Sequence, residues 1–205
     1  MSQPAAITAG VSPHARRVTL AGIIGSTLVT LALWYVLYHW LREPAGASPL
    51  PTAFACSAIA ALLALVAGVE AVAHERLVTA AIDPLAGVET RRLRVNFRYL
   101  QNTLEQFVVF AAGLLALTAY ASARILIIVT IVWVLSRWAF WIGYHFSPLL
   151  RGIGAPGMMQ SMIVLLYVAW RFGSEAYGPA AGIGLLVIFA LIEAFLFWAV
   201  KRPAQ

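Results

Sequence analysis

The chain has 205 residues, of which 62% are hydrophobic and 11% charged, and its formal net charge is +6. Soluble domains are about 45–50% apolar and about 25% charged, so this chain has too few polar side chains to cover a water-exposed surface. The composition excludes a soluble enzyme or binding module and indicates a protein solvated mainly by lipid. The basic residues are scattered rather than gathered in one tract with aromatic residues, which argues against nucleic acid as a partner.

Six segments of the sequence are long and apolar enough to cross a bilayer as helices, since a crossing takes about 20 mainly apolar residues. Helices are expected because open strand edges would leave backbone groups unpaired in lipid. Turn-forming pairs such as Asp83-Pro84, Ser147-Pro148 and Gly178-Pro179 separate several of the segments. In chain order the expected spans are 18–41, 52–73, 99–121, 123–144, 152–172 and 179–200.

The first expected span also has a second interpretation, as a cleaved secretion signal. Arg16 and Arg17 precede it, and Ala45-Gly46-Ala47 after it resembles a signal-peptidase site. The apolar region of a signal peptide has about 7–15 residues, and this segment is considerably longer. We therefore expect a retained span.

The distribution of basic residues favours one orientation in the membrane. With a cytoplasmic N-terminus, the outer side holds three basic residues, Arg42, Arg124 and Arg171. The cytoplasmic side then holds nine, namely Arg16, Arg17, Arg76, Arg91, Arg92, Arg94, Arg151, Lys201 and Arg202. This bias follows the positive-inside tendency, so we expect both termini in the cytoplasm.

Several ionisable residues fall at membrane depth, where each needs a partner or a purpose. Arg98, Asn102 and Glu105 are spaced i, i+4 and i+7, so they share one face of the third expected span. Arg137 lies toward the end of the fourth span. The connection Ser122-Ala123 is so short that the two spans are expected to be antiparallel neighbours, which brings the start of one beside the end of the other.

This arrangement predicts that Arg98, Arg137 and Arg151 converge near one carboxylate, Glu105. One interpretation is structural: the arginines extend to the membrane interface or lock helices together by pairing with Glu105. One carboxylate cannot neutralise three arginines, however. The surplus positive charge favours a polar cleft that binds a small acidic molecule.

The residues of this face resemble two motifs of the MAPEG family, the membrane-associated proteins in eicosanoid and glutathione metabolism. Residues 98–105 (Arg-Tyr-Leu-Gln-Asn-Thr-Leu-Glu) are similar to R-x-x-x-N-x-x-E, and residues 137–144 (Arg-Trp-Ala-Phe-Trp-Ile-Gly-Tyr) to R-x-x-Y-x-x-G-Y. Arg151 follows Tyr144 by seven residues, where the leukotriene-synthase branch places its catalytic arginine. The resemblance covers roughly residues 52–172.

The resemblance implies an all-α membrane protein whose residues 52–172 form a left-handed four-helix bundle. It also implies a homotrimer that binds glutathione between subunits near the cytoplasmic side. The rest of the chain then adds a cytoplasmic segment, 1–17, and an extra transmembrane helix with a linker, 18–51. A second extra helix with a basic tail, 173–205, completes the chain.

The resemblance further implies which residues act. Glutathione, as co-substrate, would be held by Arg76, Arg98, Asn102, Glu105, Arg137 and Tyr144. Glu105 would face the ammonium of the glutamyl arm, and the arginines would face the carboxylates. Arg151 would stabilise the thiolate, which then attacks a lipophilic electrophile or hydroperoxide arriving through the lipid. This chemistry needs no metal, and no metal site is expected.

Two other functions stay open beside a membrane glutathione transferase or peroxidase. Phe140 stands where the second motif usually has a tyrosine, and Leu100 occupies a place that is polar in the leukotriene-synthase branch. These departures keep open a non-catalytic scaffold of the same fold. A small-anion transporter would also place charges at membrane depth, although transporters often have internal repeats and none is visible here.

Overall fold

The computed structural model describes residues 12–200, which form helices and connecting turns and, within that range, no strand. Six helical segments are long and apolar enough to cross a membrane: Pro13–Trp40, Pro49–Leu77, Arg91–Leu117, Ala123–Phe146, Pro148–Tyr177 and Pro179–Ala199. The prediction of an all-helical, multi-pass membrane protein is therefore confirmed. Residues 1–11 of the expected cytoplasmic segment, and Lys201 and Arg202 of the basic tail, lie outside the described residues.

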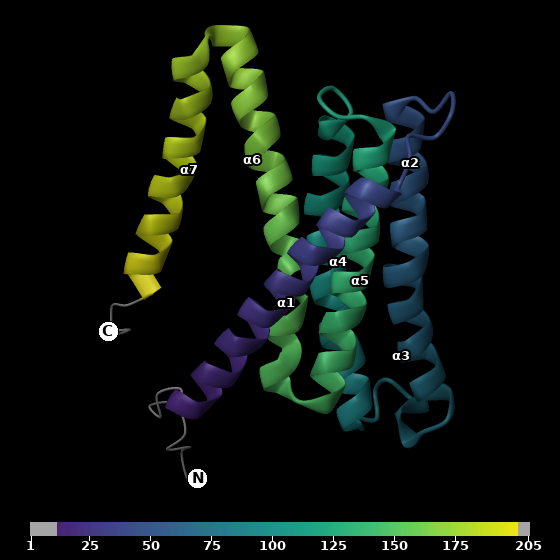
Figure 1. Cartoon of the computed structure of the whole chain (residues 1–205). Coiled ribbons are helices and arrows are strands. Elements are labelled where there is room, and N and C mark those ends of the chain that lie inside the picture. Colours follow the sequence, from purple (N-terminus) through teal and green to yellow (C-terminus); the bar gives the residue numbers. More distant parts are fainter. Residues whose placement is uncertain (1–11, 201–205) are drawn as a thin grey trace.

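The second, third, fourth and fifth spans form a four-helix bundle, and the first and last spans lie outside it (Figure 1). α1 crosses obliquely over α5, α6 and η3, whereas α7 packs only against α6 among the described elements. The elements are α1 (Pro13–Trp40), α2 (Pro49–Ala60), η1 (Ala61–Val66), α3 (Ala67–Leu77), η2 (Ala80–Ile82), α4 (Arg91–Leu117), α5 (Ala123–Phe146), η3 (Pro148–Gly154), α6 (Ala155–Tyr177) and α7 (Pro179–Val200).

The bundle core joins a stripe of small side chains on the second span to large rings on α4 and α5. Ala53, Cys56 and Ala60 recur every three or four residues and are buried, as the face of a packed helix requires. Opposite them, Phe110 and Trp133 stack with ring centroids 4.5 Å apart. Small residues allow close approach of helices in lipid, where packing rather than water exclusion holds helices together.

One turn of the second span, η1, is π-helical and binds side chains from the neighbouring helices. The carbonyl oxygen of Leu63 accepts a hydrogen bond from Trp138 Nε1 at 3.0 Å, and that of Ala64 accepts one from the Tyr99 hydroxyl at 3.0 Å. π-helical turns are rare and often lie at functional sites. Here the turn fixes two aromatic residues, of which Tyr99 stands with its ring centroid 5.9 Å from Cζ of Arg137.

The third transmembrane helix begins earlier than the sequence indicated. α4 begins at Arg91, whereas hydropathy placed the start of the span near Tyr99. Thr90 caps the helix by accepting a hydrogen bond from the Leu93 amide at 3.0 Å, and its hydroxyl donates to Glu75 at 2.8 Å. Hydropathy marks only the part of a helix that lies in hydrocarbon, so it does not detect the polar first turns of α4.

The short segment η3 packs its backbone directly against α5. A Cβ atom added to Gly154 would collide with the Cβ of Phe140 and lie 2.9 Å from the carbonyl oxygen of Ser136. A Cβ on Gly143 would lie 2.7 Å from the carbonyl oxygen of Leu150. Glycine at both positions therefore lets η3 approach α5 closely, and Gly154 lines the polar cavity described below.

We expect the substitution Gly154→Ala to destabilise the fold, because overpacking a tight contact costs about 1–3 kcal/mol. For a chain of this size that corresponds to a fall in Tm of roughly 2–12 °C, measurable by thermal unfolding of the purified protein in detergent. Gly25→Ala is the matched control, because nothing lies within 4 Å of a Cβ atom there. Equal melting curves for the two variants would contradict the close contact of η3 with α5.

Candidate functional site

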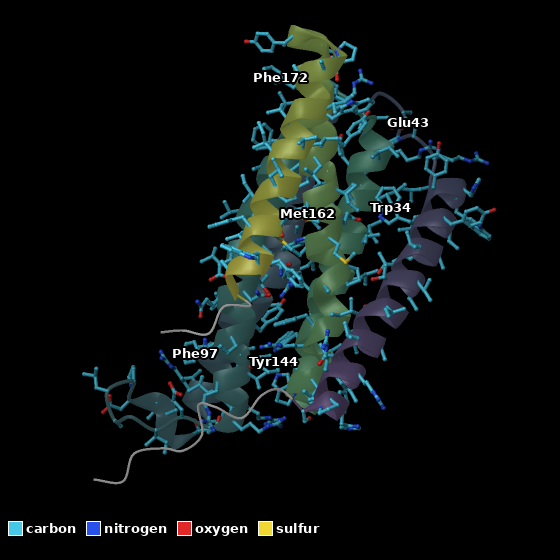
Figure 2. All side chains as sticks on the ribbon, turned by 90° about the vertical axis from the view of Figure 1, so that its left-hand side faces the viewer. Trp34, Glu43, Phe97, Tyr144, Met162 and Phe172 are labelled. Atoms are coloured by element: carbon cyan, nitrogen blue, oxygen red, sulfur yellow. The ribbon has the colours of Figure 1, made fainter. Side chains whose placement is uncertain are left out.

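A polar cavity of about 370 Å³ lies between α4, α5 and the segment where η3 passes into α6. Figure 2 shows Tyr144 toward the same end of the bundle as Phe97 and far from Phe172 and Glu43 at the other end. The cavity is lined by Arg98, Gln101, Asn102, Glu105, Gln106, Arg137, Phe140, Tyr144, Arg151, Gly152, Gly154 and Ala155. Six of the seven site residues predicted from the sequence thus line one cavity.

Arg137 is the buried centre of this site, with 0% of its surface exposed. Its Nη2 donates to Asn102 Oδ1 at 2.9 Å, its Nη1 to Gln106 Oε1 at 2.8 Å, and its Nε to Thr103 Oγ1 at 3.3 Å. All three acceptors are neutral, and within residues 12–200 no carboxylate forms an ion pair with Arg137. Its hydrogen bonds are therefore largely satisfied while its charge is left uncompensated, a costly state that an anion in the cavity would relieve.

Aromatic rings hold the same guanidinium from its other sides. The Cζ atom of Arg137 lies 4.5 Å from the ring centroid of Phe140 and 5.9 Å from that of Tyr99. The Tyr99 ring in turn stacks on Trp141 with centroids 4.7 Å apart. Phe140 thus supplies a ring face for a cation–π contact, which needs no hydroxyl group. The departure from tyrosine at this position leaves the support of Arg137 intact.

The remaining charged groups of the cavity do not neutralise one another. Arg98, Glu105 and Arg151 are exposed to the cavity and form no ion pair with one another or with Arg137 in the described part of the chain. Glu105 accepts a hydrogen bond from Gln101 Nε2 at 3.2 Å. Pairing of Arg98 or Arg137 with Glu105 as a helix lock, one of the two forms of the structural interpretation, is not observed among residues 12–200. The lining therefore presents three positive groups and one negative group to a ligand.

Arg76 is the predicted site residue that the structure does not bring to the cavity. It lies on α3, and its guanidinium stands over the ring of Phe97 with 5.2 Å from Cζ to the centroid. Its Nε is buried and has no hydrogen-bond partner in the described residues. Within a single chain, Arg76 does not line the polar cavity.

Two residues that support Arg137 were not identified from the sequence as part of the site. Gln106 and Thr103 provide two of the three acceptors, and Gln106 Nε2 also donates to Asn102 Oδ1 at 3.2 Å. The available signal was helical spacing, because Gln106 follows Asn102 by four residues and so faces the same side. Their amide and hydroxyl groups carry no charge and gave no reason to single them out.

A second polar cavity, of about 330 Å³, lies between α3, α4 and α5 and contains His74, Glu75 and His145 among its lining residues. His145 Nε2 lies 3.1 Å from Asn96 Oδ1, so this histidine is engaged within the second cavity. In the stretch from 12 to 200, no three His, Cys, Asp or Glu side chains are grouped so that they could hold one metal ion.

The profile of the MAPEG family matches residues 51–174. The chain belongs to the MAPEG family. The match covers the four helices of the bundle except for the first residues of α2 and the last residues of α6. It includes every residue that lines the polar cavity, whereas α1 and α7 lie outside it. No curated protein and no solved structure gave a match. The family includes glutathione transferases and peroxidases together with members of other kinds, so membership establishes the helical bundle and leaves the activity to be argued from the site.

Proposed function

We propose that this MAPEG protein is a membrane-bound glutathione transferase or peroxidase. The observation that carries the proposal is the fully buried, uncompensated Arg137 in a cavity with two further arginines and one unpaired carboxylate. Glutathione has two carboxylates, one ammonium group and one thiol, so its charges complement that lining. Binding would supply the counter-ion that Arg137 lacks.

Each polar group of the lining has a role in this proposal. Arg98 and Arg137 bind the carboxylates through charge-assisted hydrogen bonds, which are stronger than neutral ones. Glu105 binds the ammonium group. Asn102 uses its Oδ1 to orient Arg137, and its amide nitrogen, which makes no hydrogen bond in residues 12–200, is left to donate to the peptide. The Tyr144 side chain lines the same cavity and contributes its hydroxyl group to the thiol end.

Arg151 acts on the thiol. A free thiol has a pKa near 8.5, so little thiolate exists at neutral pH. A guanidinium a few ångströms from the sulfur favours the thiolate by electrostatic attraction. The thiolate then forms a bond to an electrophilic carbon, whose leaving group takes the bonding electrons. With a hydroperoxide it attacks the terminal oxygen and the O–O bond breaks. The alkoxide takes a proton and leaves as an alcohol, and a second glutathione reduces the resulting sulfenic acid to the disulfide and water. Holding both reactants in one site removes part of the entropic barrier.

The proposal includes assembly as a homotrimer with both termini and the cavity on the cytoplasmic side. The excess of basic residues at the cavity end of the bundle supports this orientation. Arg76, which does not reach the cavity of its own chain, would then serve the site of a neighbouring subunit. The guanidinium of Arg76 makes no hydrogen bond or ion pair within residues 12–200, which supports a partner outside the single chain.

Titration calorimetry with glutathione tests the proposed function. We expect saturable binding by the wild type and binding at least about tenfold weaker by Glu105→Gln, because a hydrogen bond to a charged group contributes about 1.5–3 kcal/mol. Glu175→Gln is the matched control, since Glu175 is paired with Arg171 outside the polar cavity.

A scaffold and a transporter would each give a different result from the proposed enzyme in assays of binding, flux and conjugation. A scaffold would release no binding heat with glutathione at any concentration tested. A transporter would carry labelled glutathione or a smaller anion into liposomes, whereas the proposed enzyme conjugates glutathione to a chlorodinitrobenzene-type electrophile without flux. Absence of both binding and conjugation would refute the proposed function.

A further inference from the structure

A larger cavity, of about 750 Å³, lies between α1 and the bundle and is lined mainly by apolar side chains. Cavities that bind small molecules have volumes of about 300–1,000 Å³, so this one is large enough for a ligand. α1 forms one wall with Thr27, Thr30, Leu31 and Trp34. α1 lies outside the region that matches the family, whereas the lining residues on α4, α5 and α6 lie within it, so this chain adds the α1 wall to the matched region.

The cavity is elongated along α6. Its lining residues on that helix run from Pro156 to Tyr167, which at 1.5 Å per residue is a length of about 16 Å. It begins beside the polar cavity, because Ala155 lines the polar cavity and the next residue, Pro156, lines the apolar one. An extended hydrocarbon chain matches this length and this lining.

The one amide side chain that lines the apolar cavity makes no polar demand on a ligand. This side chain, Gln160, accepts a hydrogen bond from Trp34 Nε1 at 2.7 Å and donates one to the Val129 carbonyl oxygen at 2.8 Å. Both ends of this amide are thus occupied within the protein. The hydrogen bond between Trp34 and Gln160 joins α1 to α6 and so keeps the two cavity walls together.

Polar groups gather at the far end of the cavity. The rings of Tyr120 and Tyr167 meet edge to face with centroids 6.4 Å apart, and neither hydroxyl group has a hydrogen bond within residues 12–200. Arg171 stands over the Tyr120 ring, 5.2 Å from Cζ to the centroid, and is already paired with Glu175. Two free hydroxyl groups beside a neutralised arginine suit a small polar group better than the phosphate headgroup of a bilayer lipid.

We propose that this cavity binds a single-chain fatty acyl compound, with its chain along α6 and its carboxyl or hydroxyl end at Tyr120 and Tyr167. The proposal does not depend on glutathione chemistry. It gives α1 a function, since without that helix the same face of α5 and α6 would be an open surface in contact with bulk lipid.

Photolabelling with palmitic acid that carries a diazirine at its chain end tests this site. We expect the label on residues near Pro156 and Thr27, at the end remote from the tyrosines, and saturable competition by unlabelled palmitic acid. Met159→Trp should reduce labelling at least about fivefold, because a larger side chain overfills the cavity. Met158→Trp is the matched control: Met158 is 37% exposed and Met159 38%, but only Met159 lines the cavity.

Three results would overturn the proposal. Labelling of the wild type that unlabelled palmitic acid does not reduce would show only solvation by lipid, and this measurement needs no variant. Equal labelling of the two tryptophan variants would place the ligand elsewhere. Equally strong labelling by a diazirine-labelled two-chain phospholipid, undiminished by palmitic acid, would identify a bilayer lipid as the occupant. None of these experiments contains glutathione, so their failure leaves the proposed function untouched.

Discussion

Replacement of Arg137 by methionine is expected to reduce glutathione binding at least about a hundredfold. The side chain supplies the only fully buried charge of the cavity lining, and its three hydrogen-bond acceptors are neutral. Loss of two charge-assisted hydrogen bonds at about 1.5 kcal/mol each corresponds to that change in Kd. Arg137→Lys should bind with intermediate strength, because it keeps the charge and loses the planar fork. Titration calorimetry measures both.

Two further variants separate charge from packing in this result. Gln106→Glu places a carboxylate where Arg137 Nη1 now donates to a neutral oxygen at 2.8 Å, so it should weaken glutathione binding while every side chain stays in place. Arg124→Met, outside the polar cavity, should bind glutathione as the wild type does. Unchanged binding by Arg137→Met and Gln106→Glu would show that Arg137 only joins α4 to α5.

The sequence was enough to predict that polar side chains of α4 and α5 lie close together, because two simple rules determine this. Helical spacing places Arg98, Asn102 and Glu105 on one face, and a connection at Ser122-Ala123 makes α4 and α5 antiparallel neighbours. The neutral side chains that accept hydrogen bonds from Arg137 could not be predicted in the same way. Which of the amides near it turns inward depends on side-chain rotamers and packing, on which the sequence gives no direct information.

For the transmembrane helices, too, the sequence predicts some features and not others. Their number follows from hydropathy, but hydropathy does not say which face of an apolar helix meets protein and which meets lipid. The cavity beneath α1 and the isolation of α7 on α6 were therefore not predicted. The π-helical turn at Ala61–Val66 was missed for a related reason, since a run of alanine, leucine and valine fits an ordinary helix equally well.

Replacement of Arg151 by alanine is expected to lower turnover at neutral pH about ten- to thirtyfold and to move the pH dependence of kcat/KM to higher pH. A nearby positive charge lowers the pKa of a thiol by about 1–3 units, so its removal raises the pKa of bound glutathione. Below that pKa, each unit reduces the thiolate fraction tenfold. The two proteins should therefore differ most at low pH and converge where the thiol is fully ionised in both.

The pH profile distinguishes electrostatic activation from a role in binding. Arg151→Lys keeps a positive charge and should retain most of the profile, whereas Arg171→Ala, outside the polar cavity, should leave it unchanged. If Arg151→Ala raises KM for glutathione at constant kcat and does not shift the profile, Arg151 binds the peptide and does not ionise it. Because Arg151 is exposed to the cavity and makes no ion pair within residues 12–200, no protein partner competes with a thiolate for its charge.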